Sequence, residues 1–355
     1  PIVTAMVKYY STEMVRTVVN HAMDVMGGKA ISRGPRNVMA HPYMGLPIGV
    51  TVEGANILTR TLIVFGQGAI RCHPYVLKEF NAINDEKLRD FDRAFFGHLG
   101  LVVRNFCRVL VRSIWTPILM LLPVGPRIKY YAEIKWSSAK FSLMADMALG
   151  LLGGQLKRKE IITGRFTDIL AWMYFSIAVL TRFENEGKPK DEWPFVHFAL
   201  HRAHQVIGQS FSDIARNLGL PFKLLHFISP QQPFQFYYSD KVKLRMVGSL
   251  QRTSDIRDRL SEGCYVSEDE SDPVGCMEAA FKLQEDLEPV LKRLKTAQRK
   301  KRIKKGPLLM VLPDALEKLI IDEQEFKDLT NLETLREEVI AVDDFTPAAY
   351  KNIRP

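Results

Sequence analysis

The chain has 355 residues, of which 46% are hydrophobic and 25% are charged. This balance is typical of globular proteins and excludes a disordered chain, and the length allows two domains or one large domain. The formal net charge is +9. The four cysteines (Cys72, Cys107, Cys264 and Cys276) form no Cys-x-x-Cys pair, so neither a metal knuckle nor a redox pair is expected, and their scarcity fits a reducing compartment.

The first 26 residues predict a helix. They place apolar side chains near one helical face, namely Ile2, Ala5, Met6, Tyr9, Met14, Val18, Ala22 and Val25. Gly27 and Gly28 come directly after them, and glycine commonly ends helices.

Glu53 is the strongest candidate for a catalytic residue. It stands among apolar, β-branched residues, is followed by Gly54, and precedes a helix-like segment from Ile57 to Phe65. Burial makes a carboxylate more basic, which would suit it to accept a proton at neutral pH. Glycine permits a backbone geometry or a close ligand approach that a side chain would forbid. The alternative is a solvated acid in a loop that leads into a helix.

The rest of the chain predicts an all-α fold. Strand alternation is hardly visible, and clear breaks occur at 187–189 and 219–221. The polar junction at 81–87 predicts a boundary between a first domain over residues 1–80 and a second over 88–355. Long helices are expected over roughly 90–113, 127–153, 159–186, 190–217, 239–261, 276–301 and 313–340.

One histidine cluster has the spacing of a metal site. His197, His201 and His204 are four and three residues apart, which places them on one helical face. No acid follows His197 in the manner of zinc proteases, and Arg202 adds positive charge. A hydrogen-bonded histidine face is therefore preferred, and no metal is predicted.

Two further segments have partner-binding alternatives. The apolar run Ser113–Gly125 is too short to span a membrane, so core packing is the first interpretation. Contact with an anionic membrane, with Trp115 at the level of the headgroups, is the alternative. The basic run 292–305 is interpreted as a solvated helix end, or as a site for lipid headgroups or CoA phosphates. It lacks interleaved aromatic residues, so nucleic acid is not expected.

Two motifs carry a resemblance to a known family. Residues 24–30, Asp-Val-Met-Gly-Gly-Lys-Ala, correspond to the family pattern Gln-x-x-Gly-Gly-x-Gly. Residues 52–60, Val-Glu-Gly-Ala-Asn-Ile-Leu-Thr-Arg, correspond to the family pattern Tyr/Phe-Glu-Gly-Thr-Asn-x-Ile-Leu-Arg. Residues 8–75 thus resemble the last part of the catalytic core of the acyl-CoA dehydrogenases, closest to the long bacterial FadE type. The part after about residue 88 resembles the extra C-terminal helical region of that type.

The resemblance implies a catalytic base. In this family a glutamate removes the α-proton of a fatty acyl-CoA thioester while the β-hydrogen leaves as hydride to the FAD, giving trans-2-enoyl-CoA. Glu53 holds the position of that base. The flavin carries the redox chemistry, and the protein supplies position and electrostatics.

The resemblance also implies flavin contacts. Gly27 and Gly28 match the double glycine that lets the backbone approach the FAD of a neighbouring subunit. Gly54, Ala55 and Asn56 come after the base and border the flavin in the family. The sequence departs from the pattern at three positions, each of which alters a flavin contact: Asp24 replaces Gln, Ala30 replaces Gly, and Ala55 replaces Thr.

The family further implies partners and a location. They are a fatty acyl-CoA substrate, an electron-transfer flavoprotein or similar acceptor, a second copy in a homodimer, and a cytoplasmic location, with peripheral contact to the inner membrane as an option. An N-terminal helical domain and a middle β domain precede this region in the family, so we expect the chain to be part of a longer enzyme and inactive alone. The alternative function is a non-catalytic helical module for dimerisation or membrane attachment.

Overall fold

The computed structural model describes residues 2–230 and 239–352, and every regular element within them is a helix. The all-α prediction is therefore confirmed. The chain forms two compact units, one of Pro1–Glu13 with Ile48–Lys243 and the other of Met14–Pro47 with Leu244–Pro355. The predicted boundary at 81–87 does not coincide with these units, because α5 (Val76–Asn84) packs against α6 (Leu88–Leu121) inside the first.

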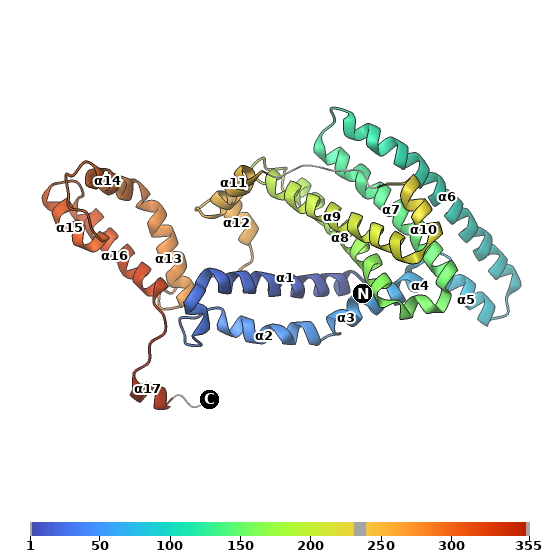
Figure 1. Ribbon diagram of the computed structural model, residues 1–355, viewed down its shortest axis with the longest axis horizontal. Coiled ribbons are helices and arrows are strands. Elements are labelled where there is room, and N and C mark those ends of the chain that lie inside the picture. Colours follow the sequence, from blue (N-terminus) through green and yellow to red (C-terminus); the bar gives the residue numbers. More distant parts are fainter. Residues whose placement is uncertain (1, 231–238, 353–355) are drawn as a thin grey trace. The chain divides into compact units, whose positions relative to one another are not determined.

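The first unit is a layered bundle. Helices α7, α8 and α9 lie alongside one another, with α6 against α7 and α10 against α9 (Figure 1). Helices α1 (Ile2–Met26) and α2 (Ala40–Thr51) contribute one end each to this unit. The remaining elements are α3 (Asn56–Leu58), the π-helix η2 (Thr59–Gln67), α4 (Gly68–Cys72), α7 (Pro126–Leu152), the 3₁₀-helix η3 (Gly153–Arg158), α8 (Glu160–Asn185), α9 (Trp193–Leu218) and α10 (Leu220–Ile228).

Large aromatic side chains form the centre of the first unit. Trp136, Phe166 and Phe211, from α7, α8 and α9, are fully buried. Phe65 of the π-helix stacks on Phe166, with ring centroids 4.4 Å apart. Burying such rings is a large hydrophobic gain, and the stacked pair fixes the π-helix to α8. The segment after Glu53 is thereby anchored to the core.

A lysine is also buried in this core. Lys140 of α7 has no exposed surface, and its ammonium lies 4.7 Å from the Trp136 ring centroid and 5.0 Å from that of Phe211. It donates a hydrogen bond to the Ser229 carbonyl and lies 3.3 Å from His226 Nδ1. Burial lowers the pKa of Lys140 to about 7, and the nearby Glu133 opposes that effect only in part. Burial and the Lys140 charge lower the pKa of His226 to about 4.

The second unit has its own core. Leu294, Leu312 and Leu329 are buried together between α14, α15 and α16. Its elements are the other ends of α1 and α2, the 3₁₀-helix η1 (Gly27–Ile31), α11 (Asp240–Leu250) from Leu244 onward, α12 (Asp255–Ser261), α13 (Pro273–Asp286), α14 (Glu288–Arg299), α15 (Leu308–Glu317), α16 (Glu323–Ile340) and α17 (Pro347–Asn352).

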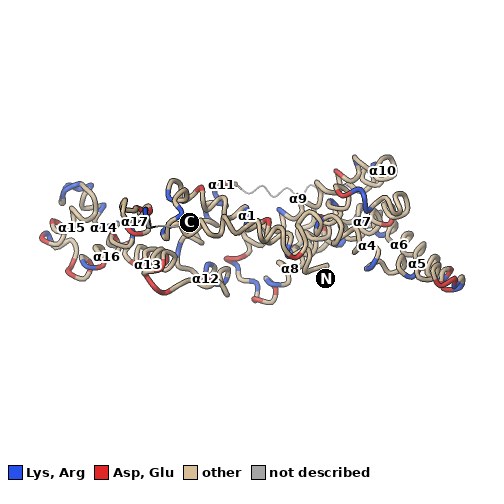
Figure 2. The backbone as a smooth tube through the Cα atoms, turned by 90° about the horizontal axis from the view of Figure 1, so that it is seen from below, with Lys and Arg blue, Asp and Glu red and all other residues tan. Residues whose placement is uncertain are grey.

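The basic run is partly paired inside this unit. Figure 2 shows its Lys and Arg positions on α14 and the loop that leads to α15. Lys292 pairs with Glu288 at 2.8 Å, and Arg293 pairs with Glu325. These contacts favour the interpretation as a solvated helix end.

Several predicted helices need correction. The predictions over 127–153, 159–186 and 190–217 are confirmed within a few residues, but 239–261, 276–301 and 313–340 are each two helices instead of one. Asp272 caps the start of α13, and Asp322 forms a capping box with Glu325 at the start of α16. The helix predicted over 90–113 extends to Leu121, so most of the Ser113–Gly125 run is helical.

Candidate functional site

Glu53 lies in a short loop with an uncommon backbone. Residues 52–55, hereafter the Glu53 loop, connect α2 to α3. Glu53 has φ 54° and Gly54 has φ 92°, two successive residues in the left-handed region. Glycine adopts this region readily, whereas a glutamate there is uncommon and stores strain unless its surroundings hold it in place.

Contacts from α1 hold this loop. Lys8 Nζ donates to the Gly54 carbonyl at 2.7 Å and to Asn56 Oδ1 at 2.8 Å. The buried Asn56 amide in turn donates to Thr12 Oγ1 at 2.9 Å and to Glu13 Oε1 at 2.7 Å. Both ends of the Asn56 side chain are therefore occupied within the chain, and the exit of the Glu53 loop is fixed to α1.

The Glu53 side chain itself is exposed. Of the two interpretations of this position, the exposure matches the solvated acid in a loop, and the described residues do not bury the carboxylate. Val52 beside it is also exposed, at 49%. A dry environment for this carboxylate would have to come from groups other than the described residues of this chain.

A partly buried ionic network anchors the segment after the loop. Arg60 pairs with Asp168 of α8 through two hydrogen bonds, at 2.9 and 2.5 Å, and the Tyr10 hydroxyl donates to the same carboxylate at 2.5 Å. The hydrogen bond to Asp168 raises the pKa of Arg60, and burial, with the Asp168 charge, raises the pKa of Tyr10. Sequence reasoning missed Tyr10 and Asp168, although Arg60 belongs to the second motif.

Gly27 and Gly28 lie in the second unit, at the start of η1. Gly27 has φ 57°, which explains a glycine there. Gly28 has no positive φ, and a Cβ at either position would meet no atom within 4 Å. Lys29 Nζ donates to the Val339 carbonyl at 2.7 Å, which ties the adjoining residue to α16. The positive φ explains why position 27 is glycine, but the backbone conformation and the space around position 28 do not require glycine there.

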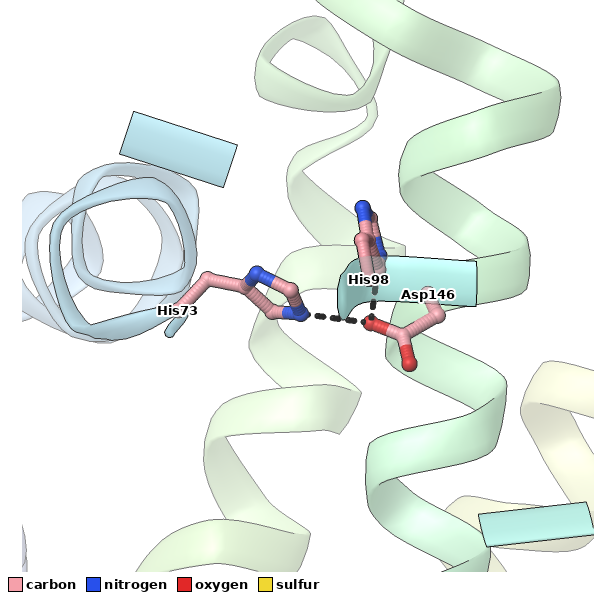
Figure 3. A group of neighbouring side chains, drawn as sticks. All are labelled: His73, His98 and Asp146. Atoms are coloured by element: carbon pink, nitrogen blue, oxygen red, sulfur yellow. Dashed lines mark hydrogen bonds and ion pairs between the residues drawn. The ribbon is translucent and has the colours of Figure 1, made fainter. Parts of the chain in front are cut away.

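Three other side chains meet in the manner of a metal site. His73, His98 and Asp146 converge from the α4–α5 connection, α6 and α7 (Figure 3). The His73 Nε2 atom lies 2.9 Å from Asp146 Oδ1, and the His98 Nε2 atom lies 3.8 Å from it. His98 Nδ1 lies 2.9 Å from Glu79 Oε1.

The hydrogen bonds of His73 argue against a metal at this cluster. Its Nδ1 atom accepts from the backbone N–H groups of Tyr75 and Val76, at 3.2 and 3.0 Å. A neutral imidazole has one lone pair on its ring nitrogens, and here Nδ1 uses it. Nε2 then carries hydrogen and donates to Asp146, so it has no lone pair for a metal ion. We interpret the cluster as an internal network that starts α5 and ties it to α7.

Asp146→Leu tests this interpretation. We expect a loss of about 2 kcal/mol of unfolding free energy, because the buried His73 N–H loses its acceptor. Asp85→Leu, which breaks an exposed pair with Lys87, should cost under about 0.5 kcal/mol. Urea unfolding of the wild-type chain should be unchanged by added zinc chloride. Stabilisation of the wild type by zinc, absent in Asp146→Leu, would contradict the assignment.

The histidines of α9 bind separate partners. His197 Nδ1 lies 2.8 Å from the Tyr130 hydroxyl, and His204 Nδ1 lies 3.2 Å from Glu133 Oε1. Burial lowers the pKa of His197. His197 is thus within hydrogen-bond distance of α7, and His204 lies close to an acid of the same helix.

Comparison with protein families covers nearly the whole chain. Residues 1–65 match the family described as acyl-CoA dehydrogenase, C-terminal domain, and residues 70–345 match the family described as acyl-CoA dehydrogenase, C-terminal, bacterial type. No solved structure matches the chain. The first match contains the Glu53 loop, and the second contains α5 to α16. The chain therefore belongs to the acyl-CoA dehydrogenases, as a C-terminal region of the bacterial type.

Proposed function

We propose that this chain is the C-terminal part of an FAD-dependent acyl-CoA dehydrogenase in which Glu53 removes the α-proton of a fatty acyl-CoA. The observation that carries the proposal is an exposed carboxylate held in a strained loop by Lys8 and Asn56, at the position of the family's base. Residues in uncommon backbone regions concentrate at active sites, where the fold compensates for their strain. Replacing Glu53 by glutamine tests the assignment.

The loop contacts suit a positioned general base. A base must lie within hydrogen-bond reach of the proton that it removes, so its main chain has to be fixed while its carboxylate stays accessible. Lys8 and Thr59 both donate to the Gly54 carbonyl, at 2.7 and 3.2 Å, directly beside the base. The Glu53 carboxylate takes no part in these two hydrogen bonds, which leaves it available to substrate.

The glycines fit an approach by FAD. The open space at Gly27 and Gly28 would admit a flat ring against the main chain, and Gly28 has no other reason to be glycine. Because the Asn56 amide is occupied, we propose that Gly54, Ala55 and Asn56 would contribute main-chain groups. When bound, FAD supplies the acceptor for the β-hydrogen. The family relation supports an acyl-CoA substrate and oligomeric assembly, and we propose a homodimer with an electron-transfer flavoprotein as acceptor.

A second candidate function, contact with an anionic membrane, is favoured by α6. Two helices in the described part of the chain are long and apolar enough to cross a membrane, or three if the bent pair Ala40–Thr51 and Asn56–Cys72 counts as one span. Core packing explains α8, where Phe166 and Ile169 are fully buried. It does not explain α6, whose apolar window is only 17% buried.

The exposed face of α6 fits a bilayer surface. Spacings of three and four residues place on one face Phe96, Leu99, Val103 and Phe106, each at least 43% exposed. Arg108 and Arg112 lie in the same helix, and charges at the centre of a bilayer are costly, so we propose that α6 lies in the interface instead of spanning. Such contact would place the enzyme at the cytoplasmic surface of the inner membrane.

Liposome flotation tests the membrane contact. We expect the chain to float with phosphatidylglycerol vesicles and to float less with neutral phosphatidylcholine vesicles. Phe106→Asp should reduce recovery severalfold, because it places a charge in the apolar face. Phe227→Asp changes a still more exposed phenylalanine, on α10, and should leave recovery unchanged. Equal recovery of both variants would contradict the role of α6.

A further inference from the structure

A groove between α6, α7 and α8 combines unpaired cations with an apolar wall. It has a volume of about 590 Å³, within the range of small-molecule sites, and lies wholly in the first unit. Its lining contains no residue of the Glu53 loop. The groove is therefore a separate place in the molecule, and ligand binding there is independent of the role of Glu53.

Arginines form one side of the groove. Arg104, Arg108 and Arg112 are spaced at intervals of four residues, so α6 presents all three on one face, and Lys135 of α7 lines the same groove. Among the described residues, none of the four has an acidic partner within 4 Å, whereas Arg60, Arg127 and Arg182 each have one. Three like charges stacked along a helix repel one another, so an anion in the groove would relieve that repulsion.

Other residues that line the groove are apolar. They include Ile134 of α7 with Met173, Tyr174 and Ile177 of α8. Tyr174 is 38% exposed and Ile177 is 45% exposed. Ser138 and Ser142 of α7 also line the groove and supply hydroxyl groups. The groove thus offers cations and apolar surface to one elongated ligand.

We propose that this groove binds an amphiphile with a phosphorylated head and a fatty acyl chain. Arginine guanidinium groups match phosphate oxygens in paired hydrogen bonds, and the apolar wall would cover part of the acyl chain. Long-chain acyl-CoA and anionic phospholipid share this chemistry. Neither a bare phosphate nor an uncharged acyl chain would use both the cations and the apolar residues of the groove.

Titration calorimetry on the 355-residue chain tests the proposal with four probes: palmitoyl-CoA, CoA alone, inorganic phosphate, and short-chain phosphatidylglycerol below its micelle concentration. We expect palmitoyl-CoA or phosphatidylglycerol to bind at least about tenfold more tightly than CoA or phosphate, because only these two engage the apolar wall. Binding of palmitoyl-CoA alone identifies acyl-CoA as the source, and binding of phosphatidylglycerol alone identifies a membrane lipid. Equal binding of all four probes would overturn the proposal.

Variants locate the binding. Arg104→Gln with Arg108→Gln should weaken it at least about tenfold, and Ile177→Gln should weaken the acyl probes but not phosphate. Arg299→Gln with Lys300→Gln removes the same charge from the exposed basic run and should leave binding unchanged. Arg104 and Arg108 are exposed, so circular dichroism should show an unaltered fold. Unchanged affinity in the Arg104 and Arg108 variant, or an equal loss in the Arg299 and Lys300 variant, would refute the site.

Discussion

Glu53→Gln is expected to lower the rate of acyl-CoA dehydrogenation roughly a thousandfold, because general-base catalysis by one side chain contributes a factor of this order. Glutamine keeps the shape of the side chain but cannot accept the α-proton. The contacts of Lys8 with Gly54 and Asn56 do not involve the carboxylate, so the loop and the flavin content should be retained. The measurement is dye-coupled turnover of a long-chain acyl-CoA by the whole enzyme that contains this chain, with flavin absorbance recorded in parallel.

Glu86→Gln provides a matched control for this prediction. Glu86 is also an exposed glutamate in the left-handed region, with φ 57°, but it lies between α5 and α6. Its replacement should leave turnover unchanged. If Glu53→Gln retained turnover, or if both variants lost it equally, Glu53 would not be the base.

Lys140 is expected to make the stability of the protein rise with pH. Its folded-state pKa of about 7 lies below the ordinary value of 10.5, so the unfolded chain binds one more proton between those values. Stability therefore increases as pH rises through this window, and the cost of burying the ammonium is fully present below pH 7. The full window corresponds to about 5 kcal/mol of unfolding free energy, most of it gained between pH 7 and pH 10.

The comparison of wild type with Lys140→Met isolates this effect. We expect the unfolding free energy of wild type, relative to the variant, to rise by about 3 kcal/mol between about pH 7 and pH 10. Urea unfolding at several pH values measures it, and the difference cancels the titration of tyrosines and other lysines. Met keeps the length and apolar stem of the side chain. A difference that stays constant with pH would show that Lys140 keeps its proton in the fold.

Local sequence signals predicted most of the helices. The apolar periodicity of residues 1–26 and the glycines after it gave a helix that ends at Met26. Apolar periodicity also predicted single helices where the structure has two, because the periodicity continues across the short connections between them. The Asp322 and Glu325 pair was a readable start signal for α16, three residues apart as a capping box requires.

The end of α6 was a different kind of error. The predicted helix stops at residue 113, whereas the observed helix contains Pro117, although proline lacks an amide hydrogen and disfavours a helix interior. The helix nevertheless continues to Leu121, because Thr116 is buried in the first unit and the tertiary contacts of α6 outweigh one lost hydrogen bond. The sequence does not indicate which face of α6 is buried, so its exposed apolar face could be identified only in the structure.

Periodicity and motif spacing were sufficient to predict the all-α class and the family, because both are properties of neighbouring residues. Which distant groups meet depends on the tertiary packing. Asp168 is 108 residues from Arg60, Lys8 is 46 residues from Gly54, and the arginines of α6 line one groove with apolar residues of α8. Such partners depend on how helices pack, which a pattern within one helix does not encode. The same holds for Glu53, whose exposure depends on the surfaces that surround its loop.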